Sequence, residues 1–236
     1  MPPKPIKKEL ADDPGYLAMR AFKKAYDGAN TELGTEPLAL PLEIGEEHTC
    51  FARLVLTPQI TGAHSHARIG PAHIRPLGIA LAPYPFLRRL CFWSVDVRDD
   101  GALSLASYLM VNKNLRVLEI TDCGLGSSAC KALGDALSTK SGPKELHTLR
   151  LDYNRGIRNA GAAAIMPVSG ILSVKELSLS FCGLEGEAGG AVLANGLLSK
   201  PMLTHLHING NPLGSAGIMH VLAGITTSLV SKSSMV

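Results

Sequence analysis

The chain has 236 residues, of which 46% are hydrophobic and 18% charged, and its formal net charge is +3. These proportions are ordinary for a globular protein with a core, and they exclude a disordered or fibrous chain. A net charge this small does not by itself imply nucleic-acid binding. No apolar run approaches the roughly 18 to 20 residues that a membrane-spanning helix requires.

The five cysteines are an odd number and follow no disulfide-like spacing. The first ten residues, MPPKPIKKEL, carry charge but no apolar centre, so they fit neither a secretory nor a mitochondrial targeting segment. Because disulfide scaffolds belong to oxidising compartments, we expect free thiols and a cytoplasmic protein.

The first predicted element is a helix that starts near Pro14, in the segment DPGYLAMRAFKKAYDGANTEL. The stretch that follows it, TEPLALPLEI, is too rich in proline for a central strand. We interpret residues 1–45 as an N-terminal tail and a helix that caps the domain formed by residues 46–236.

Residues 51–86 are interpreted as a degenerate first repeat of that domain. FARLVL, residues 51–56, is its predicted strand, and PAHIRPLGIAL, residues 71–81, is its predicted helix. The insertion TPQITGAHSHAR, residues 57–68, lies between them. Insertions in repeat proteins fall in loops on one face, often the binding face, and the role of this one is left open.

From residue 87 onward, one frame of the form LxxLxIxxCxL recurs five times over residues 87–229. Its copies are LRRLCFWSVDV, LRVLEITDCGL, LHTLRLDYNRGI, VKELSLSFCGL and LTHLHINGNPL, which start 28, 31, 28 and 29 residues apart. Each copy is predicted to form a short strand whose apolar side chains point inward at every second position.

The segment after each frame shows a second repeated pattern. The residue four positions after the last apolar loop residue is always small: Gly101, Ala129, Gly161, Ala188 and Gly217. The residue eight positions after it is always aliphatic: Leu105, Leu133, Ile165, Val192 and Val221. These columns predict an amphipathic helix in every unit, and such units bury their apolar faces by stacking into a curved solenoid.

The frame and its helix resemble the leucine-rich repeat family in its ribonuclease-inhibitor type, whose units have 28 or 29 residues and a full helix. The resemblance implies an α/β solenoid with a curved parallel sheet inside and helices outside, closed here by the N-terminal helical cap. It departs at the 31-residue spacing, where DYNRGI has one extra residue and the linker SGPKE is longer. The family includes inhibitors, GTPase activators, immune receptors and axonemal scaffolds, so the fold alone does not give the function.

The ninth position of the frame alternates between two residue types in four successive copies: Cys123, Asn154, Cys182 and Asn211. An asparagine there can hydrogen-bond to the backbone of the turn, and a cysteine is a weaker donor of small, apolar size. We therefore expect these sulfurs to be structural rather than reactive or metal-binding. The remaining cysteines are expected to be inert: Cys50, Cys91 and Cys130.

The outward strand positions of such a sheet form the concave surface, which is the natural ligand surface of the fold. All of them are expected to be exposed, including Cys91 and Glu119. Because Trp, Tyr and Arg are enriched in interface hot spots, the only tryptophan, at position 93, supports a binding role. The alternative is that the aromatic side chains pack on adjacent loops. The predicted partner-binding residues are Arg89, Trp93, Glu119, Asp122, Arg150, Asp152, Tyr153, Phe181, His205 and His207.

Metal or cofactor chemistry is not expected. His205 and His207 project from one strand face, but a zinc site needs at least one more protein ligand. Three histidines in or near the insertion are expected to be solvated: His64, His66 and His73. No phosphate-binding loop, nucleophile elbow or paired-cysteine motif occurs, so neither catalysis nor a small-molecule substrate is expected.

Charge is unevenly distributed, because residues 48–95 contain no Asp or Glu. The same stretch contains five arginines: Arg53, Arg68, Arg75, Arg88 and Arg89. They either form a positive surface for an acidic partner or are scattered around the solenoid.

These features predict a non-catalytic protein–protein interaction module or a scaffold subunit of a larger assembly. The expected partner is a protein, an acidic protein is one option for it, and neither a membrane nor a nucleic acid is expected. The family resemblance makes a cytoskeletal or ciliary setting one expectation. Because the last repeat has no recognisable polar cap, its end is expected either to fray or to be covered by another chain.

The alternative function is regulation of a small GTPase, in resemblance to the Ran GTPase-activating protein. That protein is followed by an acidic tail, whereas this chain closes with SKSSMV. An inhibitor of a basic nuclease fits less well, because the predicted concave face has mixed charge.

Overall fold

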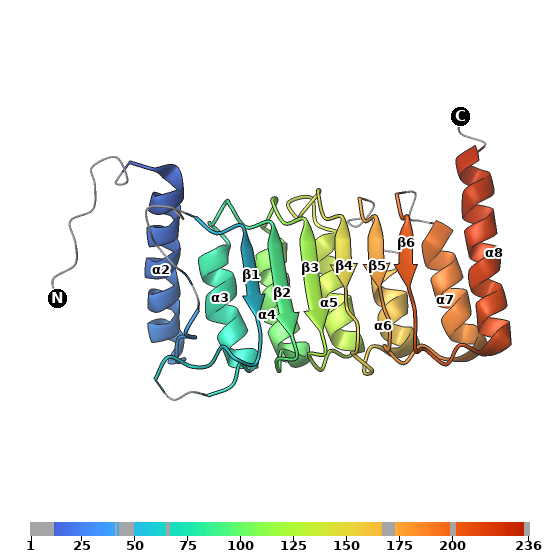
Figure 1. Ribbon diagram of the computed structural model, residues 1–236, viewed down its shortest axis with the longest axis horizontal. Helices are drawn as coiled ribbons and strands as arrows, with labels where there is room; N and C mark the ends of the chain where they lie inside the picture. The colour runs from blue at the N-terminus through green and yellow to red at the C-terminus, as the bar shows by residue number, and fades with distance from the viewer. Residues whose placement is uncertain are drawn as a thin grey trace.

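The computed structural model describes residues 12–40, 42, 50–64, 67–166, 173–198 and 202–233. Six strands form one parallel sheet in the order β1 to β6, and a layer of helices covers one of its faces (Figure 1). The strands are β1 Arg53–Leu56, β2 Arg89–Trp93, β3 Val117–Thr121, β4 Thr148–Arg150, β5 Glu176–Ser178 and β6 His205–His207. The helices are α2 Pro14–Leu33, α3 Ile74–Leu81, α4 Arg98–Leu109, α5 Ser127–Leu137, α6 Arg158–Ile165, α7 Gly186–Leu198 and α8 Gly214–Ser233. The predicted solenoid is confirmed.

One column of leucines runs across the whole sheet and defines its register. It consists of Leu54, Leu90, Leu118, Leu149, Leu177 and Leu206. The first five are almost fully buried, and only the last, in the edge strand, is partly exposed. Because β1 joins this column through Leu54, the degenerate first unit has the same register as the clear repeats.

Helix α2 packs against α3 at one end of the solenoid (Figure 1). The Asp13 carboxylate caps it by accepting a hydrogen bond from the Tyr16 N–H at 2.8 Å, and Gly34 ends it with a left-handed φ of 63°. Phe22 and Tyr26 face the core, and the Tyr26 hydroxyl accepts a hydrogen bond from the Leu38 N–H at 2.9 Å. The expected tail and the expected boundary at residue 45 lie outside the described residues.

In the first unit, the predicted strand is shorter in the structure and the predicted helix is divided in two. Its strand begins at Arg53, and its helical segment divides into a 3₁₀ turn, η1 Pro71–His73, and α3. Within the insertion, Thr61 pairs with Arg68 in an antiparallel bridge and Gly62 pairs with Leu38. The insertion therefore folds back against the segment that follows α2.

The predicted small and aliphatic columns hold in four helices and are wrong in α7. Ala188 is exposed and Val192 only partly buried, whereas their neighbours Gly189 and Leu193 face the core. In the turn that leads into α7, the residue with left-handed backbone is Gly186, two positions after the buried Leu184. In α4 and α6 the corresponding residue comes directly after the loop residue, so the turn before α7 takes one residue more.

The C-terminal segment does not fray within the described residues, because α8 continues to Ser233. Its outer side is apolar, and the exposed large hydrophobic residues on it are Ile218, Met219, Leu222, Ile225, Leu229 and Val230. Strand β6 pairs with β5 on one side only. No described helix is both long enough and apolar enough to cross a membrane.

Candidate protein-binding surface

The concave face of the sheet is less exposed than the sequence suggests. Cys91 is 0% exposed and Glu119 only 8%, so the expectation that both are accessible is wrong. The physical reason is that long neighbouring side chains lie across these positions. The Trp93 indole N–H donates to the Glu119 carboxylate at 3.0 Å, and the Arg89 guanidinium lies 3.7 Å from the same carboxylate. Three predicted residues therefore form one satisfied cluster on β2 and β3.

A second polar cluster joins β4, β5 and β6. Arg150 forms an ion pair with Glu176, and His207 Nε2 lies 3.6 Å from the same carboxylate oxygen. The His205 and His207 rings lie 6.5 Å apart at 15°. Glu176 is not among the predicted site residues. It occupies the same outward position of its repeat as Thr148, with which it is paired across the sheet, so the repeat pattern could have identified it. No group of three His, Cys, Asp or Glu side chains among the described residues could hold a metal ion.

The two predicted aspartates make local hydrogen bonds. Asp122 accepts from the Ser94 hydroxyl at 3.0 Å. Asp152 accepts from the Ser180 backbone N–H at 2.7 Å and from the Ser178 hydroxyl at 2.5 Å. These carboxylates support the turns at the carboxyl ends of the strands, so their first role is structural.

The two predicted aromatic residues at the rim form a stacked pair. The Tyr153 and Phe181 rings lie 4.6 Å apart at 8°, and Tyr153 remains 53% exposed. Both have left-handed backbone, with φ of 60° and 57°, which is uncommon for bulky residues. Gly210 follows in the next unit, and a Cβ there would lie 2.2 Å from the Phe181 ring. The absence of a side chain at Gly210 thus makes room for the pair.

Two arginines beside the aromatic pair were missed. Arg155 and Arg158 are exposed and, with Phe181 and Glu185, line a hollow of about 420 Å³. Neither guanidinium makes an ion pair with a described residue. The equivalent of Arg158 in the unit of β2 is Arg98, which pairs with Asp96.

The difference between these two loops follows from the sequence. Counting from the loop residues Val97 and Ile157, the position of Asp96 is occupied by Gly156 in the later unit. Arg158 therefore lacks the local carboxylate that Arg98 has. The 31-residue spacing places the extra residue in this same loop, and that irregularity was the available sequence signal.

The cysteines of the repeats are buried and structural. The Cys123 sulfur lies 3.2 Å from the Thr121 carbonyl and 3.4 Å from the Phe92 carbonyl. Burial raises the pKa of four thiols to about 12: Cys91, Cys123, Cys130 and Cys182. Thiols that remain protonated are poor nucleophiles. Cys50 is partly exposed, and all five cysteines are free.

The arginines of residues 48–95 are spread over different parts of the solenoid. Arg53 and Arg89 lie side by side on the sheet, Arg75 is on α3, and Arg88 donates to the Pro85 carbonyl at 2.8 Å. Of the two predicted arrangements, a single positive surface or arginines scattered around the solenoid, the structure has the scattered one. His73 accepts from the Gly70 N–H at 3.0 Å. The expectation for His66 lies outside the described residues.

Comparison with known proteins finds a matching family model and similar sequences. A family model described as Leucine Rich repeat matches residues 111–134 and 199–221. The ribonuclease inhibitor of Sus scrofa is 36% identical over 111 residues, which cover 46% of this chain and 23% of that protein. NACHT, LRR and PYD domains-containing protein 5 of Homo sapiens is 30% identical over 141 residues, which cover 58% of this chain and 11% of that protein.

The chain thus spans less than a quarter of the length of these two relatives. A solved structure named Leiomodin-1 Actin-Binding Site 2 aligns over 91% of this chain and 92% of its own, with 12% identity and a TM-score of 0.47. The fold and the sequence matches together define a leucine-rich repeat protein. Within that class, the chain is of the ribonuclease-inhibitor type, with one full strand–helix unit in each repeat.

Proposed function

We propose that the chain is a non-catalytic protein-binding module that holds its partner at the carboxyl-terminal rim of the concave sheet. The observation that carries this proposal is the stacked pair of Tyr153 and Phe181, which is partly open to solvent beside two arginines that make no ion pair with a described residue. A few residues supply most of the binding energy in protein interfaces, and Trp, Tyr and Arg are the types most enriched among them. The left-handed backbone of both residues recurs at the same position of the other repeats, at Ser94, Asp122 and Gly210, so the turn of the repeat fixes where the two rings lie.

The rim favours a partner segment with a carboxylate close to an apolar side chain. Arg155 and Arg158 give two positive charges to the hollow, and Glu185 gives one negative charge, so the net charge of these three side chains is +1. A guanidinium that has no carboxylate of its own can form a bidentate ion pair with one from a partner. The Phe181 ring supplies the apolar wall of the same hollow.

The setting that we propose is cytoplasmic, with a role as a scaffold subunit, and association with the cytoskeleton or a cilium is one form of it. Five free cysteines support a reducing compartment. The named relatives support a binding role for the repeats only in general terms. Nothing in the described part of the chain favours the GTPase-regulator alternative over a binding module.

Quantitative affinity capture from the source cells tests the proposal. Wild-type protein would be compared with Tyr153→Ala and with the double variant Arg155→Glu/Arg158→Glu. Lys131→Glu on α5 is the control, because it also reverses one exposed positive charge but lies on the convex side. We expect the rim variants to lose the same partner at least tenfold and the control to keep it. Equal recovery by all variants would place the binding surface elsewhere.

A further inference from the structure

The two ends of the solenoid differ in the chemistry of their outer helices (Figure 1). Helix α2, at the amino-terminal end, has charged residues along its exposed side: Arg20, Lys23, Lys24, Asp27 and Glu32. Leu17 is the one large hydrophobic residue exposed on this helix. Helix α8, at the other end, has no Asp, Glu, Lys or Arg from Gly214 to Val230. Terminal units with a polar outer face keep repeat proteins soluble, and only the α2 end has such a face.

The exposed apolar residues of α8 have the spacing of a coiled-coil seam. Four of them are separated by four, three and four residues, so they lie in one line along the helix: Ile218, Leu222, Ile225 and Leu229. This line is roughly 16 Å long. Met219 and Val230 are exposed beside it and widen the apolar surface. A seam of this kind on one helix is typical of a surface that packs against a second helix.

A hollow of about 300 Å³ lies beside the seam, between α8 and the last strand of the sheet. Ile225 and Leu229 line it from α8, and Leu203 and Leu206 line it from the segment of β6. Leu206 continues the leucine column of the sheet, but it is partly exposed because β6 is the last strand of the described sheet. The hydrophobic core of the solenoid is therefore open at this end.

The described chain does not cover this end with a further repeat. Apart from the long loop, successive frames start 28 or 29 residues apart, so the frame after Leu203 would start at Ser231 or Lys232. Both positions still belong to α8, which ends at Ser233. The helix thus occupies the place in the chain at which the repeat would begin its next strand.

The open surface is as large as a stable interface requires. The six exposed large hydrophobic residues of α8 are 38–65% exposed, which leaves roughly 600 Å² open if a fully exposed residue of this size has roughly 200 Å². This value lies at the upper limit of about 300–600 Å² for the largest apolar patch of a monomer. A standard interface takes about 800 Å² from each partner, and somewhat more than half of that area is nonpolar. The α8 surface alone supplies that nonpolar share.

We propose that the α8 end binds the α8 end of a second copy of this chain and forms a two-fold symmetric dimer. A two-fold axis perpendicular to the sheet places the two α8 helices antiparallel and sets β6 beside β6, so that each layer meets its equivalent. Leu222 of one copy then meets Ile225 of the other at the middle of the seam.

The chemistry of the seam favours a second copy over a different protein. Charged residues that flank a seam set the choice of partner in helix pairs, and α8 has none from Gly214 to Val230. Two copies therefore meet without repulsion between like charges. The charged outer side of α2 does not match this surface, so copies do not stack head to tail. Because the same patch is used on both sides, assembly stops at two copies.

Sedimentation velocity of the purified full chain tests this dimer. Over about 1 to 100 μM we expect a single dimeric species with a Kd below about 1 μM, which is within the range for an interface of this size. Leu222→Glu places a carboxylate on both sides of the seam and should raise the Kd at least hundredfold. Met219→Lys, at the edge of the seam, should raise it at least tenfold. Both side chains are at least half exposed, so circular dichroism should show folded monomers.

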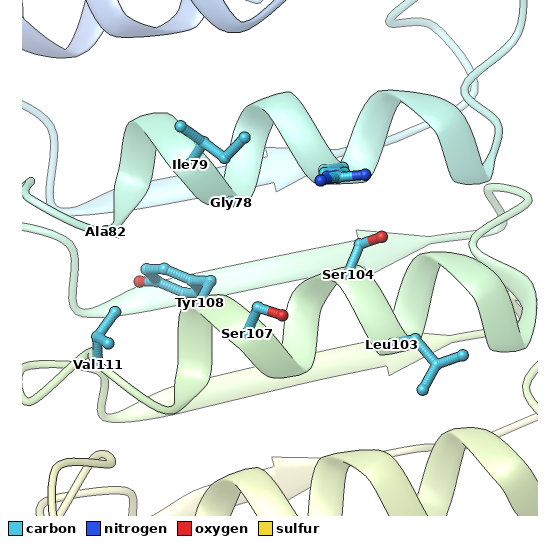
Figure 2. Close-up of a pocket in the computed structure, with 9 residues that line it drawn as sticks. Gly78, Ile79, Ala82, Leu103, Ser104, Ser107, Tyr108 and Val111 are labelled. Atoms are coloured by element: carbon cyan, nitrogen blue, oxygen red, sulfur yellow. The ribbon is translucent and has the colours of Figure 1, made fainter. Parts of the chain in front are cut away.

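Leu103→Glu is the matched control, because Leu103 is 53% exposed and Leu222 is 51% exposed. Leu103 lies on α4, beside a groove on the convex side between α3 and α4 (Figure 2). This variant should remain a dimer. A wild-type chain that is monomeric at about 100 μM would overturn the proposal and leave the end to a different protein. Assemblies larger than a dimer, or an equal loss of dimer in the control, would also overturn it.

Disulfide crosslinking tests the antiparallel arrangement. In a Cys50→Ser background the four remaining thiols are buried. The double variant Leu222→Cys/Ile225→Cys should form a covalent dimer on mild oxidation, and neither single variant should. A covalent dimer from either single variant, or none from the double variant, would overturn this arrangement. These experiments use the isolated chain and do not depend on the concave rim, so their outcome is separate from that of the proposed function.

Discussion

The buried side chain of Asn154 connects two repeats, and its removal is the sharpest test of how the solenoid is held together. Its Oδ1 accepts from the backbone N–H groups of Cys123 at 2.9 Å and of Leu125 at 3.1 Å, both in the preceding unit. Its Nδ2 donates to the carbonyls of Ile120 at 2.7 Å and Leu151 at 2.9 Å. The residue is 1% exposed, so water cannot replace these partners.

Asn154→Ala leaves two buried N–H groups without an acceptor. Each such group costs about 1–3 kcal/mol, and the loss of donors to the carbonyls adds to this, so we expect a total of about 4 kcal/mol. This is a large part of the roughly 5–15 kcal/mol by which proteins of this size are stable. Asn154→Cys should cost less free energy of unfolding than Asn154→Ala. The reason is that the sulfur of Cys123, at the equivalent position of its own repeat, contacts a backbone carbonyl.

Equilibrium urea unfolding measures this effect. With a slope of about 2 kcal/mol/M, a loss of 4 kcal/mol lowers the midpoint by about 2 M. Asn211→Ala is the matched control, because Asn211 makes the same contacts to Cys182 and Leu184 but is partly exposed beside the edge strand. It should cost less than half as much. A cost below about 1 kcal/mol at Asn154, or an equal cost at both positions, would refute the reasoning.

Two further predictions concern pH and the packing of helices. The pKa of the four buried thiols is raised to about 12, so the folded state keeps protons that the unfolded chain releases above about pH 9. The free energy of unfolding should therefore fall as pH rises above about 9, and urea titrations at pH 8 and 10 that give equal stability would contradict this. Gly190→Ala would place a Cβ 2.1 Å from the Gly217 carbonyl oxygen between α7 and α8, and should destabilise by about 2 kcal/mol or more. Gly28→Ala in α2 meets no atom within 4 Å and should stabilise by about 0.5–1 kcal/mol, so thermal melting curves of the pair should shift in opposite directions, and a shared direction would count against the assigned packing.

The architecture could be predicted from the sequence because each strand–helix unit repeats the same apolar frame. The leucine column from Leu54 to Leu206 follows directly from that frame, and the buried sulfur of Cys123 follows from the alternation of Cys and Asn. Both depend on local spacing, which a single sequence shows without any knowledge of long-range contacts.

The surface was harder to predict, because it depends on which neighbouring side chains reach each other. Glu119 is outward in the strand pattern, yet Trp93 and Arg89 cover it from the adjacent strand. Arg158 makes no ion pair with a described residue, because Gly156 stands at the position from which Asp96 pairs with Arg98, and the sequence shows this only once the two loops are aligned. The one-residue offset at Ala188 was missed because a glycine turn changes the helix phase without breaking the repeat.

The central claim, that the concave rim holds a protein partner, is tested most directly by site-specific photocrosslinking. A benzophenone amino acid would be placed at Tyr153 in one protein and at Lys131, on the convex helix α5, in another. We predict that the Tyr153 derivative crosslinks one protein from the source cells and that Arg155→Glu/Arg158→Glu in the same derivative abolishes the product. A product of equal yield from Lys131, or one that persists after charge reversal, would contradict the claim.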